Sequence, residues 1–556
     1  MGRFRNRLSE VRQGCSEIEN HLVDQLLAGR LDRRAFLRHG ARIGLSAPFA
    51  AVLLDGAGFV PLVSPARAQG RPGGNLRVAQ TVPAGAIDPV TCADLGTLCV
   101  LHQTADFLVV SAPDLQLRPQ LATSWKPNAD GSVWTFALRS GVKFHDGRTM
   151  TADDVVASID RLADPANGSN ALSAFRGVLS KGGARKVDDM TVAFHLDGPN
   201  GNFPYYVSSD NYNAIIIPAD YKGDFEKTFP GTGPFRMEKY TPKVGASFVR
   251  NPDYWGGQVM PERTEFSFYA DQQPQILALL GGQVDVVQQV VVQGAQGLFD
   301  NPAAKIIRLK SNAHRQVHMR CDTGPFADKR VRQALALTLD RPAIVRGLFR
   351  GMSDLGNDSP FSPLYPSTDP SVPQRAKDVA QAKRLMAEAG KGSGFETTLT
   401  TMQKQELPAY ATVIRNAAAE IGIKVNLNLL DSAAYYGKAV FGQSPWLDSE
   451  FGMTDYGHRG VPNVFLAAPL RSDGTWNGAH FKNPEYDRLV DGYVKALDPA
   501  AQREAAGKIQ RLLLDETPIV FAYFYDYLTA TGPRVGGVEP TAMSQLFLRS
   551  ATVAAA

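Results

Sequence analysis

The stretch at residues 117–147, LRPQLATSWKPNADGSVWTFALRSGVKFHDG, carries the clearest structural signals in the chain. Residues 134–138 alternate between the two faces of a strand, and Asp130-Gly131 before them is typical of a turn. A second turn at Asp146-Gly147 precedes Thr151, which can cap the helix that follows it. This close succession of strand, turn and helix predicts a mixed α/β domain.

The rest of the chain repeats the alternation of helices and strands, which favours α/β layers over a sandwich or a bundle. Apolar residues at helical spacing mark the helices, and short alternating or apolar runs mark the strands. The expected helices are at residues 275–280, 331–339, 376–389, 410–421 and 502–514. The expected strands after the first domain are at residues 284–287, 423–429 and 519–524.

Length and charge exclude several classes of protein. The chain has 556 residues, room for about three domains. Hydrophobic residues make up 44% of it and charged residues 21%, as in globular proteins. The net charge of +4 comes from residues 1–68, which hold ten arginines and six acidic residues, so the remainder is neutral. A neutral body argues against nucleic-acid binding.

The N-terminal segment has the order of parts found in an export signal. Arg33-Arg34 is followed by an apolar run at residues 43–54 and by Ala66-Arg67-Ala68, a small-x-small cleavage site. We expect residues 1–68 to be a signal peptide of the twin-arginine type, cleaved after Ala68. The alternative is an uncleaved anchor at residues 43–63, which Asp55 and several Pro and Gly residues disfavour.

Cysteines and histidines offer two further possibilities. Cys92 and Cys99 are close in sequence, and we expect a disulfide between them in an oxidising compartment, with two separate thiols as the alternative. His314, His318 and Cys321 could suggest zinc. Strand alternation, however, puts the two histidines on the face opposite Cys321, so we expect solvent-exposed histidines and no metal site.

Several motifs together resemble family 5 of the solute-binding proteins of ABC transporters, the group of dipeptide, oligopeptide and nickel binders. The longest match runs from residue 117 to residue 155 and includes the stretch quoted above. The other matching segments, in chain order, are GTGPF at 231–235, RNPDYW at 250–255, VRQAL at 331–335, Asp340-Arg341, and NPEYD at 483–487. The resemblance covers nearly all of the chain after residue 68.

The resemblance implies an α/β fold of the type II periplasmic-binding-protein kind, with two lobes, a hinge and an extra inserted domain. A ligand would close the cleft between the lobes. The expected parts are residues 69–112, 241–314 and 519–556 for lobe I, residues 113–240 for the extra domain with part of lobe I, and residues 315–518 for lobe II.

The same resemblance implies a function. The protein would be a monomeric periplasmic subunit of an ABC importer, with no catalytic activity, no cofactor and no nucleic-acid partner. It would capture a small-molecule ligand, a peptide or an amino-acid derivative, and deliver it to permease subunits in the inner membrane. An oligosaccharide and a nickel chelate remain alternative ligands.

The loop at residues 455–462 is the first candidate for the ligand site, since loops often carry function. Peptide binders of this family use an Asp in the matching segment to hold the ligand's ammonium, a role the resemblance assigns to Asp455. Arg459 could clamp a carboxylate through two parallel hydrogen bonds. Tyr456 and His458 add aromatic surface. The alternative is a surface salt bridge between Asp455 and Arg459.

Two further pairs of residues complete the candidate site. Trp476 and Asn477 could form an aromatic wall and a group that both donates and accepts hydrogen bonds, although Trp476 could equally pack in the core. Asn211 and Tyr212 would face the cleft from the side of lobe I.

An enzyme is a minor alternative. Ser140 and Lys143 have SxxK spacing, and residues 209–211 read SDN, as in penicillin-binding serine hydrolases. That chemistry needs the Ser at a helix N-terminus and a Lys-Thr-Gly triad. We expect Ser140 to follow a strand, and no such triad lies downstream.

Overall fold

The computed structural model describes residues 24–25 and 74–554, and the chain divides into two units, residues 1–70 and 71–556. The predicted signal peptide at residues 1–68 lies outside the described residues, except for Asp24 and Gln25. Both lobes of the fold belong to the second unit. Among the described residues, no helix combines the length and the apolar character that crossing a membrane requires.

The first of two seven-stranded sheets defines lobe I. Its strand order is β12-β20-β11-β1-β10-β9-β8, with β1 parallel to β10 and β11 and with β20 antiparallel to both of its neighbours. The helices α5 (Leu95–Thr104) and α10 (Gln272–Leu280) pack on it. The strands are β1 (Asn75–Thr81), β8 (Phe235–Thr241), β9 (Gly245–Arg250), β10 (Arg263–Tyr269), β11 (Val286–Val290), β12 (Lys305–Leu309) and β20 (Tyr527–Thr531).

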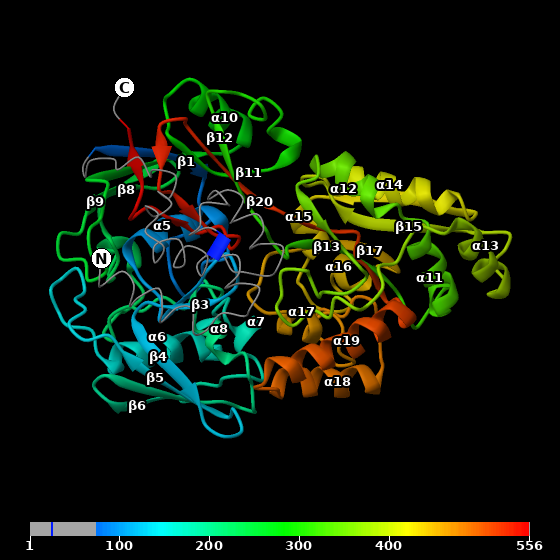
Figure 1. The fold of residues 1–556 in the computed structure, drawn as a ribbon, viewed down its shortest axis with the longest axis horizontal. Helices are drawn as coiled ribbons and strands as arrows, with labels where there is room; N and C mark the ends of the chain where they lie inside the picture. Colours follow the sequence, from blue (N-terminus) through cyan, green and yellow to red (C-terminus); the bar gives the residue numbers. More distant parts are fainter. Residues whose placement is uncertain (1–23, 26–73, 555–556) are drawn as a thin grey trace. The chain divides into compact units, whose positions relative to one another are not determined.

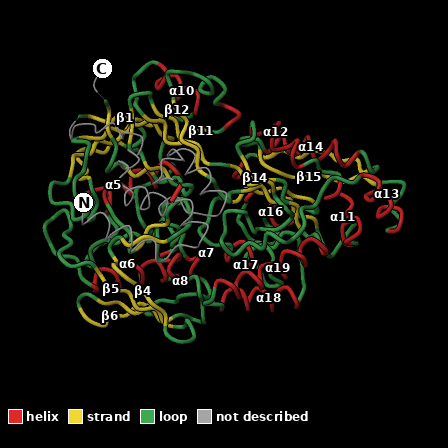
Figure 2. Tube along the Cα trace, viewed as in Figure 1, coloured by secondary structure: helices red, strands yellow, loops and turns green. Residues whose placement is uncertain are grey.

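The second seven-stranded sheet defines lobe II, and Figure 2 shows its strands as a group apart from those of lobe I. The order is β14-β19-β13-β17-β15-β16, and β18 also pairs with β13. The strands are β13 (His314–Met319), β14 (Ser353–Leu355), β15 (Phe395–Met402), β16 (Ile423–Leu430), β17 (Phe451–Tyr456), β18 (Ile519–Val520) and β19 (Tyr523–Tyr525).

Four helices of lobe II, α11 (Lys329–Leu337), α13 (Val379–Glu388), α14 (Leu407–Ala419) and α19 (Pro499–Glu516), agree with the sequence-based expectations to within a few residues at their ends, and the other helices of this lobe were not predicted. The apolar faces of the lobe II helices bury against the sheet and against one another, as the helical spacing of their apolar residues requires. The helices that were not predicted are α12 (Arg341–Phe349), α15 (Ser432–Tyr436), α16 (Pro445–Asp448), α17 (Asn463–Ala467) and α18 (Pro484–Lys495).

A four-stranded antiparallel sheet, β4-β5-β7-β6, forms the extra domain within the segment expected for it. The helix α6 (Ala152–Ala163) packs on this sheet, and the Thr151 N–H donates to Asp154 Oδ2 at 2.8 Å at its start, so the predicted helix start is correct. The strands are β4 (Ala122–Pro127), β5 (Val133–Leu138), β6 (Ala184–Asp188) and β7 (Thr191–His195).

The two lobes are joined by two chain crossings, which Figure 1 shows between the labels β12, β20 and β13. One crossing links β12 to β13 at residues 309–314, and the other links β19 to β20 at residues 525–527. The strands β18 and β19 pair within lobe II, although they follow residue 518, where we expected that lobe to end. The return to lobe I therefore comes about seven residues later than the sequence suggested.

The prediction of solvent-exposed histidines on β13 is wrong. His314 is 0% exposed and His318 is 2% exposed, while Cys321 is only half-buried. The reason is that β13 lies at the centre of its sheet, and both of its faces are covered; His314, for example, packs 4.4 Å from the Phe521 ring. The described residues hold no group of metal-ligating side chains here or elsewhere.

The structure also differs from the predicted disulfide, because Cys92 and Cys99 are both free and buried. Cys99 lies on α5 within the core of lobe I, whereas Cys92 precedes that helix and accepts a hydrogen bond from Asn213 Nδ2 at 3.2 Å. Burial raises the pKa of both thiols, so neither is a reactive thiolate at neutral pH.

Candidate ligand-binding site

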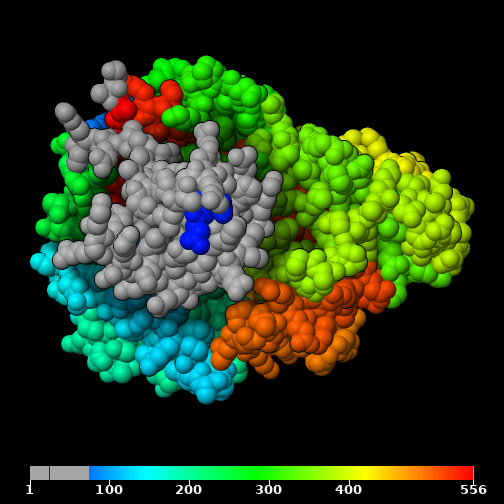
Figure 3. Space-filling model, in the orientation of Figure 1, coloured from blue at the N-terminus to red at the C-terminus, as the bar shows by residue number. Residues whose placement is uncertain are grey.

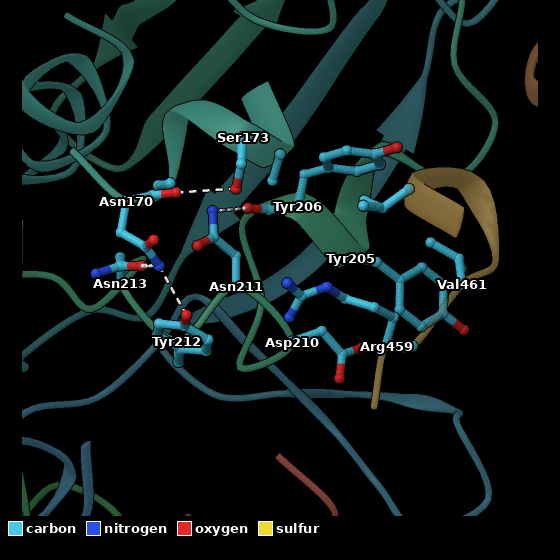
Figure 4. Close-up of a pocket in the computed structure, with 14 residues that line it drawn as sticks. Asn170, Ser173, Tyr205, Tyr206, Asp210, Asn211, Tyr212, Asn213, Arg459 and Val461 are labelled. Carbon is cyan, nitrogen blue, oxygen red and sulfur yellow. Dashed lines mark hydrogen bonds between the residues drawn. The ribbon is translucent and has the colours of Figure 1, made fainter. Parts of the chain in front are cut away.

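A small pocket lies where residues 205–213, which begin in the helix α8 (Phe203–Tyr206), meet the lobe II loop after β17. Figure 4 shows Arg459 reaching into this pocket toward Asp210 and Asn211. We call it the head pocket, and its volume is about 40 Å³. Two parts of the chain separated by about 250 residues thus form one site.

Hydrogen bonds hold the 205–213 side of the head pocket in one conformation. The Ser209 N–H donates to Val109 O at 3.0 Å, and the Asp210 N–H donates to Ser208 Oγ at 3.1 Å. Asn211 Nδ2 donates to Tyr206 O at 2.9 Å, which closes the turn. The side chains that face the pocket are therefore positioned by the backbone before any ligand arrives.

Asp210 is a functional candidate that the sequence reasoning missed. It is 8% exposed, and among the described residues its Oδ2 has no hydrogen-bond partner. Burial raises the pKa of Asp210 to about 7, although the Ser111 hydroxyl and the charge of Arg459 act in the opposite direction. The only sequence signal was its place between Ser209 and Asn211, and nothing there indicated burial.

Arg459 combines a fixed backbone with a free side chain. Its N–H donates to Asn312 Oδ1 at 2.7 Å, and its carbonyl oxygen accepts from Asn312 Nδ2 and from Tyr365 Oη. Within the part of the chain that the structure describes, its guanidinium donates no hydrogen bond and forms no ion pair. Five N–H donors are thus left for an anionic group.

Gly460 lets the loop close over Asp210. A Cβ atom at this position would lie 1.7 Å from Asp210 Oδ2 and 2.6 Å from the Tyr205 ring. A side chain at this position would have to displace the buried Asp210 carboxylate or the Tyr205 ring. Glycine at this position therefore lets the loop approach Asp210 without moving these side chains.

Asn211 and Tyr212 line the head pocket, as the sequence suggested. Tyr212 Oη accepts a hydrogen bond from Asn170 Nδ2 at 2.7 Å, and the Tyr212 carbonyl oxygen lies 3.1 Å from His102 Nε2. These contacts orient the Asn170 amide and the Tyr212 phenol in the pocket that also holds Arg459 and Asp210. The pocket therefore has polar groups as well as aromatic walls.

Asp455 does not line the head pocket. Because β13 and β17 are paired, Asp455 lies opposite Arg315, with Arg315 Nη1 at 3.9 Å, and it also bonds to Lys404 Nζ at 2.9 Å and to Tyr436 Oη at 2.7 Å. Burial alone would raise its pKa, but the charges of Lys404 and Arg315 lower it to about 2. These partners come from this chain, and the alternative salt bridge to Arg459 is not formed.

Tyr456, Trp476 and Asn477 also lie outside the head pocket. The Tyr456 and Trp476 rings stack 6.0 Å apart, and Trp476 packs against the lobe II core. Asn477 exchanges hydrogen bonds with the Phe481 backbone and donates to Arg471 O, which fixes its own loop. The packing alternative for Trp476 agrees with these contacts.

His458 lines a smaller neighbouring pocket together with Ser209 and Gln545. Its Nδ1 accepts from the Asn312 N–H at 3.2 Å, and burial lowers its pKa to about 3. A neutral imidazole in this position supports the loop and supplies no charge to a ligand. Four of the eight predicted residues thus lie at the two adjoining pockets, and four do not.

Ser140 and Lys143 lack the arrangement that the serine-hydrolase alternative needs. Ser140 lies in an exposed turn after β5, and Lys143 pairs with Thr149 in an isolated bridge. Neither residue lies on a helix, so the Lys side chain is not placed one helical turn beyond the Ser.

Residues 116–463 match the family model described as bacterial extracellular solute-binding proteins, family 5 Middle. This chain belongs to that family. Its members are substrate-binding proteins that act outside the cytoplasm and work with ABC permeases. The α/β fold with two lobes is the type II fold of periplasmic binding proteins.

Individual relatives differ in the ligand that their names give. Heme-binding protein A of Haemophilus influenzae is 26% identical over 451 residues, which cover 76% of this chain and 81% of that protein. Di/tripeptide-binding protein 1 of Pseudomonas aeruginosa is 26% identical over 436 residues, covering 72% and 79%. The periplasmic binding protein DppA of Helicobacter pylori, solved with the peptide STSA, superposes with a TM-score of 0.71 at 21% identity, covering 87% and 99%.

Proposed function

We propose that this protein binds a ligand carrying an α-amino and a carboxylate group, an amino acid derivative or a peptide, in the head pocket. The observation that carries the proposal is the pairing of a free Arg459 guanidinium with the buried, unpartnered Oδ2 of Asp210 in one small pocket of the described chain. A carboxylate would bind the guanidinium through two parallel hydrogen bonds, and an ammonium would bind the aspartate.

Capture would proceed by closure of the lobes about the two crossings. Because Arg459 belongs to lobe II and Asp210 to the 205–213 segment, a zwitterion would contact both sides at once. A ligand that bridges both sides stabilises the closed form over the open one. The closed, ligand-bound protein would then dock on permease subunits in the inner membrane.

The proposal extends to location and assembly. The twin arginines and the cleavage motif favour export of the chain through the twin-arginine route, which would place the mature protein in the periplasm. We further propose that it acts there as a monomer.

The test is a thermal-shift screen of the purified mature protein followed by calorimetry. The panel holds free amino acids, di- and tripeptides, opines, oligosaccharides and nickel chelates. We expect zwitterionic compounds to raise the melting midpoint through linkage, and R459A to weaken their binding by about a hundredfold or more. R384A, an exposed arginine on α13, is the matched control. Binding of only sugars or metal chelates, or wild-type affinity of R459A, would overturn the proposal.

A further inference from the structure

The head pocket is too small to hold a complete ligand of drug-like or peptide size. At about 40 Å³ it has room for a group of a few heavy atoms, far below the usual range of about 300–1,000 Å³ for ligand sites. Arg459 and Asp210 both face this small space. The anionic and cationic groups of a ligand would therefore have to sit on neighbouring atoms, as they do in the head of an α-amino acid.

A second, larger cavity adjoins the head pocket. It has a volume of about 480 Å³ and shares Ser173, Ala174, Tyr206 and Val464 with the head pocket as lining residues. One wall comes from the extra domain at residues 173–200, and the other comes from lobe II at α17 and α18. We call it the tail cavity.

The walls of the tail cavity are held together by contacts between the extra domain and lobe II. Asn202 Nδ2 donates to Asn463 Oδ1 at 3.0 Å, and the Gly201 N–H donates to Val494 O at 2.9 Å. In Figure 3 the orange surface of α18 and α19 meets the cyan surface of the extra domain. The cavity therefore exists in the same closed arrangement as the head pocket.

The tail cavity has an excess of unpaired positive charge. Arg471 forms ion pairs with both Asp473, at 3.2 Å, and Asp491, so these three residues carry one net negative charge, and the whole lining with Arg176 and Lys495 carries a net charge of +1. Arg176 and Lys495 also line the cavity, both are exposed, and among the described residues neither has an ion pair or a side-chain hydrogen bond. Two free cations on opposite walls favour an anionic group between them.

We propose that the ligand is an α-amino acid extended through its side chain, with the zwitterionic head in the head pocket and an acidic tail in the tail cavity between Arg176 and Lys495. A γ-glutamyl peptide has this chemistry, since its glutamate keeps both the free α-ammonium and the free α-carboxylate. An ordinary peptide does not, because its two charged ends are on different residues. This inference rests on the proposed function and deepens it.

The linkage of the peptide gives the first test. The probes are γ-Glu-Ala-Gly and its isomer α-Glu-Ala-Gly, which have the same composition and charge, together with free glutamate. By calorimetry on the mature protein, we expect the γ-linked probe to bind about tenfold or more tighter than the α-linked isomer, because only its head places both charges on one carbon. Equal affinity for the two isomers would overturn the inference.

The tail cavity gives the second test. The double variant R176A/K495A should weaken binding of γ-Glu-Ala-Gly by about tenfold and leave the affinity for free glutamate within about twofold. R185A/K438A removes two exposed cations outside the cavity and should change neither. If R176A/K495A bound the tripeptide as tightly as the wild type, the acidic tail of the ligand would not lie between these two residues, and the inference would be wrong.

The two proposals fail in different ways. If zwitterionic dipeptides bind through Arg459 but the γ-linked probe shows no preference, the proposed function stands and this inference is wrong. If no zwitterionic probe binds, or if R459A binds as the wild type does, both are wrong. Melting midpoints of all variants should stay near that of the wild type, because the four substituted tail and control positions are exposed.

Discussion

Arg315 and Arg459, two arginines of lobe II, each lie near a carboxylate, but the two clusters use their charges differently. In the first cluster, Arg315 is 1% exposed, its Nε lies 2.7 Å from Glu406 Oε1, and its guanidinium stacks 4.4 Å from the Tyr525 ring centroid. In the second, Arg459 has a fixed backbone and a guanidinium with no partner among the described residues. The first cluster is saturated by this chain, whereas the second is open to a ligand.

The comparison shows why residue type alone is a poor guide to a binding site. Asp455 and Arg459 are only four residues apart in the sequence. Asp455 belongs to the saturated cluster through Lys404 and Arg315, while Arg459 lines the head pocket. What distinguishes them is the set of partners that the fold supplies.

The largest effect is expected from breaking the saturated cluster. R315M leaves Glu406 buried without its cationic partner, so we expect a loss of about 3–5 kcal/mol in the free energy of unfolding. Urea denaturation measures it. The double variant R315M/E406L should recover most of the loss, because an apolar pair has no uncompensated charge. If R315M were as stable as the wild type, Arg315 would not be needed to compensate the buried charge of Glu406.

The next effect concerns closure over the open cluster. G460A places a methyl group 1.7 Å from Asp210 Oδ2, so the Asp210 carboxylate or the Tyr205 ring must shift, and we expect ligand affinity to fall by about thirtyfold or more with little change in melting midpoint. Calorimetry and small-angle scattering with and without ligand are the measurements. G457A is the matched control, since its Cβ would meet nothing within 4 Å. Equal loss in both variants would refute this steric account.

A moderate effect is expected from pH. Burial raises the pKa of Asp210 to about 7, so the group is largely protonated and neutral at pH 6 and charged at pH 8. If the charged form holds the ligand's ammonium, affinity should rise about tenfold from pH 6 to pH 8, the factor for a single group titrating near pH 7. D210N should bind weakly and show a flat profile over this range. A wild-type profile that is flat or falls with pH would contradict the role of Asp210.

The smallest effect on binding is expected at Asp455. D455N removes a carboxylate that Lys404 and Arg315 hold at a pKa of about 2, so its stabilising contribution is present above about pH 4 and is lost as the pH falls toward 2. At pH 7 we expect a loss of about 2–3 kcal/mol in the free energy of unfolding and an affinity within about threefold of the wild type. If D455N abolished binding at unchanged stability, Asp455 would be a ligand-binding residue, and the assignment of the ligand to Arg459 and Asp210 would be wrong.

Local signals were sufficient for the elements of the fold and for part of the site. The turn before Thr151 predicted the start of α6, and the position of Arg459 in a loop between glycines and a proline made it a candidate that also lines the head pocket. Both inferences depend on residues that are neighbours in the sequence. The family motifs, which are also local, were sufficient for the two-lobed architecture.

The errors share one physical origin, which is contact between distant segments. The burial of His318 follows from the central place of β13 in its sheet, and the neutralisation of Asp455 follows from the pairing of that strand with β17. Asp210 is buried because Gly460 closes over it from 250 residues away in the sequence. No spacing rule along the chain describes such contacts.

The position of β20 has a consequence for how the protein is made. This strand, residues 527–531, lies between β11 and β12 in the sheet of lobe I and is antiparallel to both. The sheet therefore cannot be completed during synthesis until nearly the whole chain exists, and β12 has no neighbour in the sheet before then. If the chain leaves the cytoplasm already folded, as we propose, export must wait until this late strand has been synthesised and has joined the sheet.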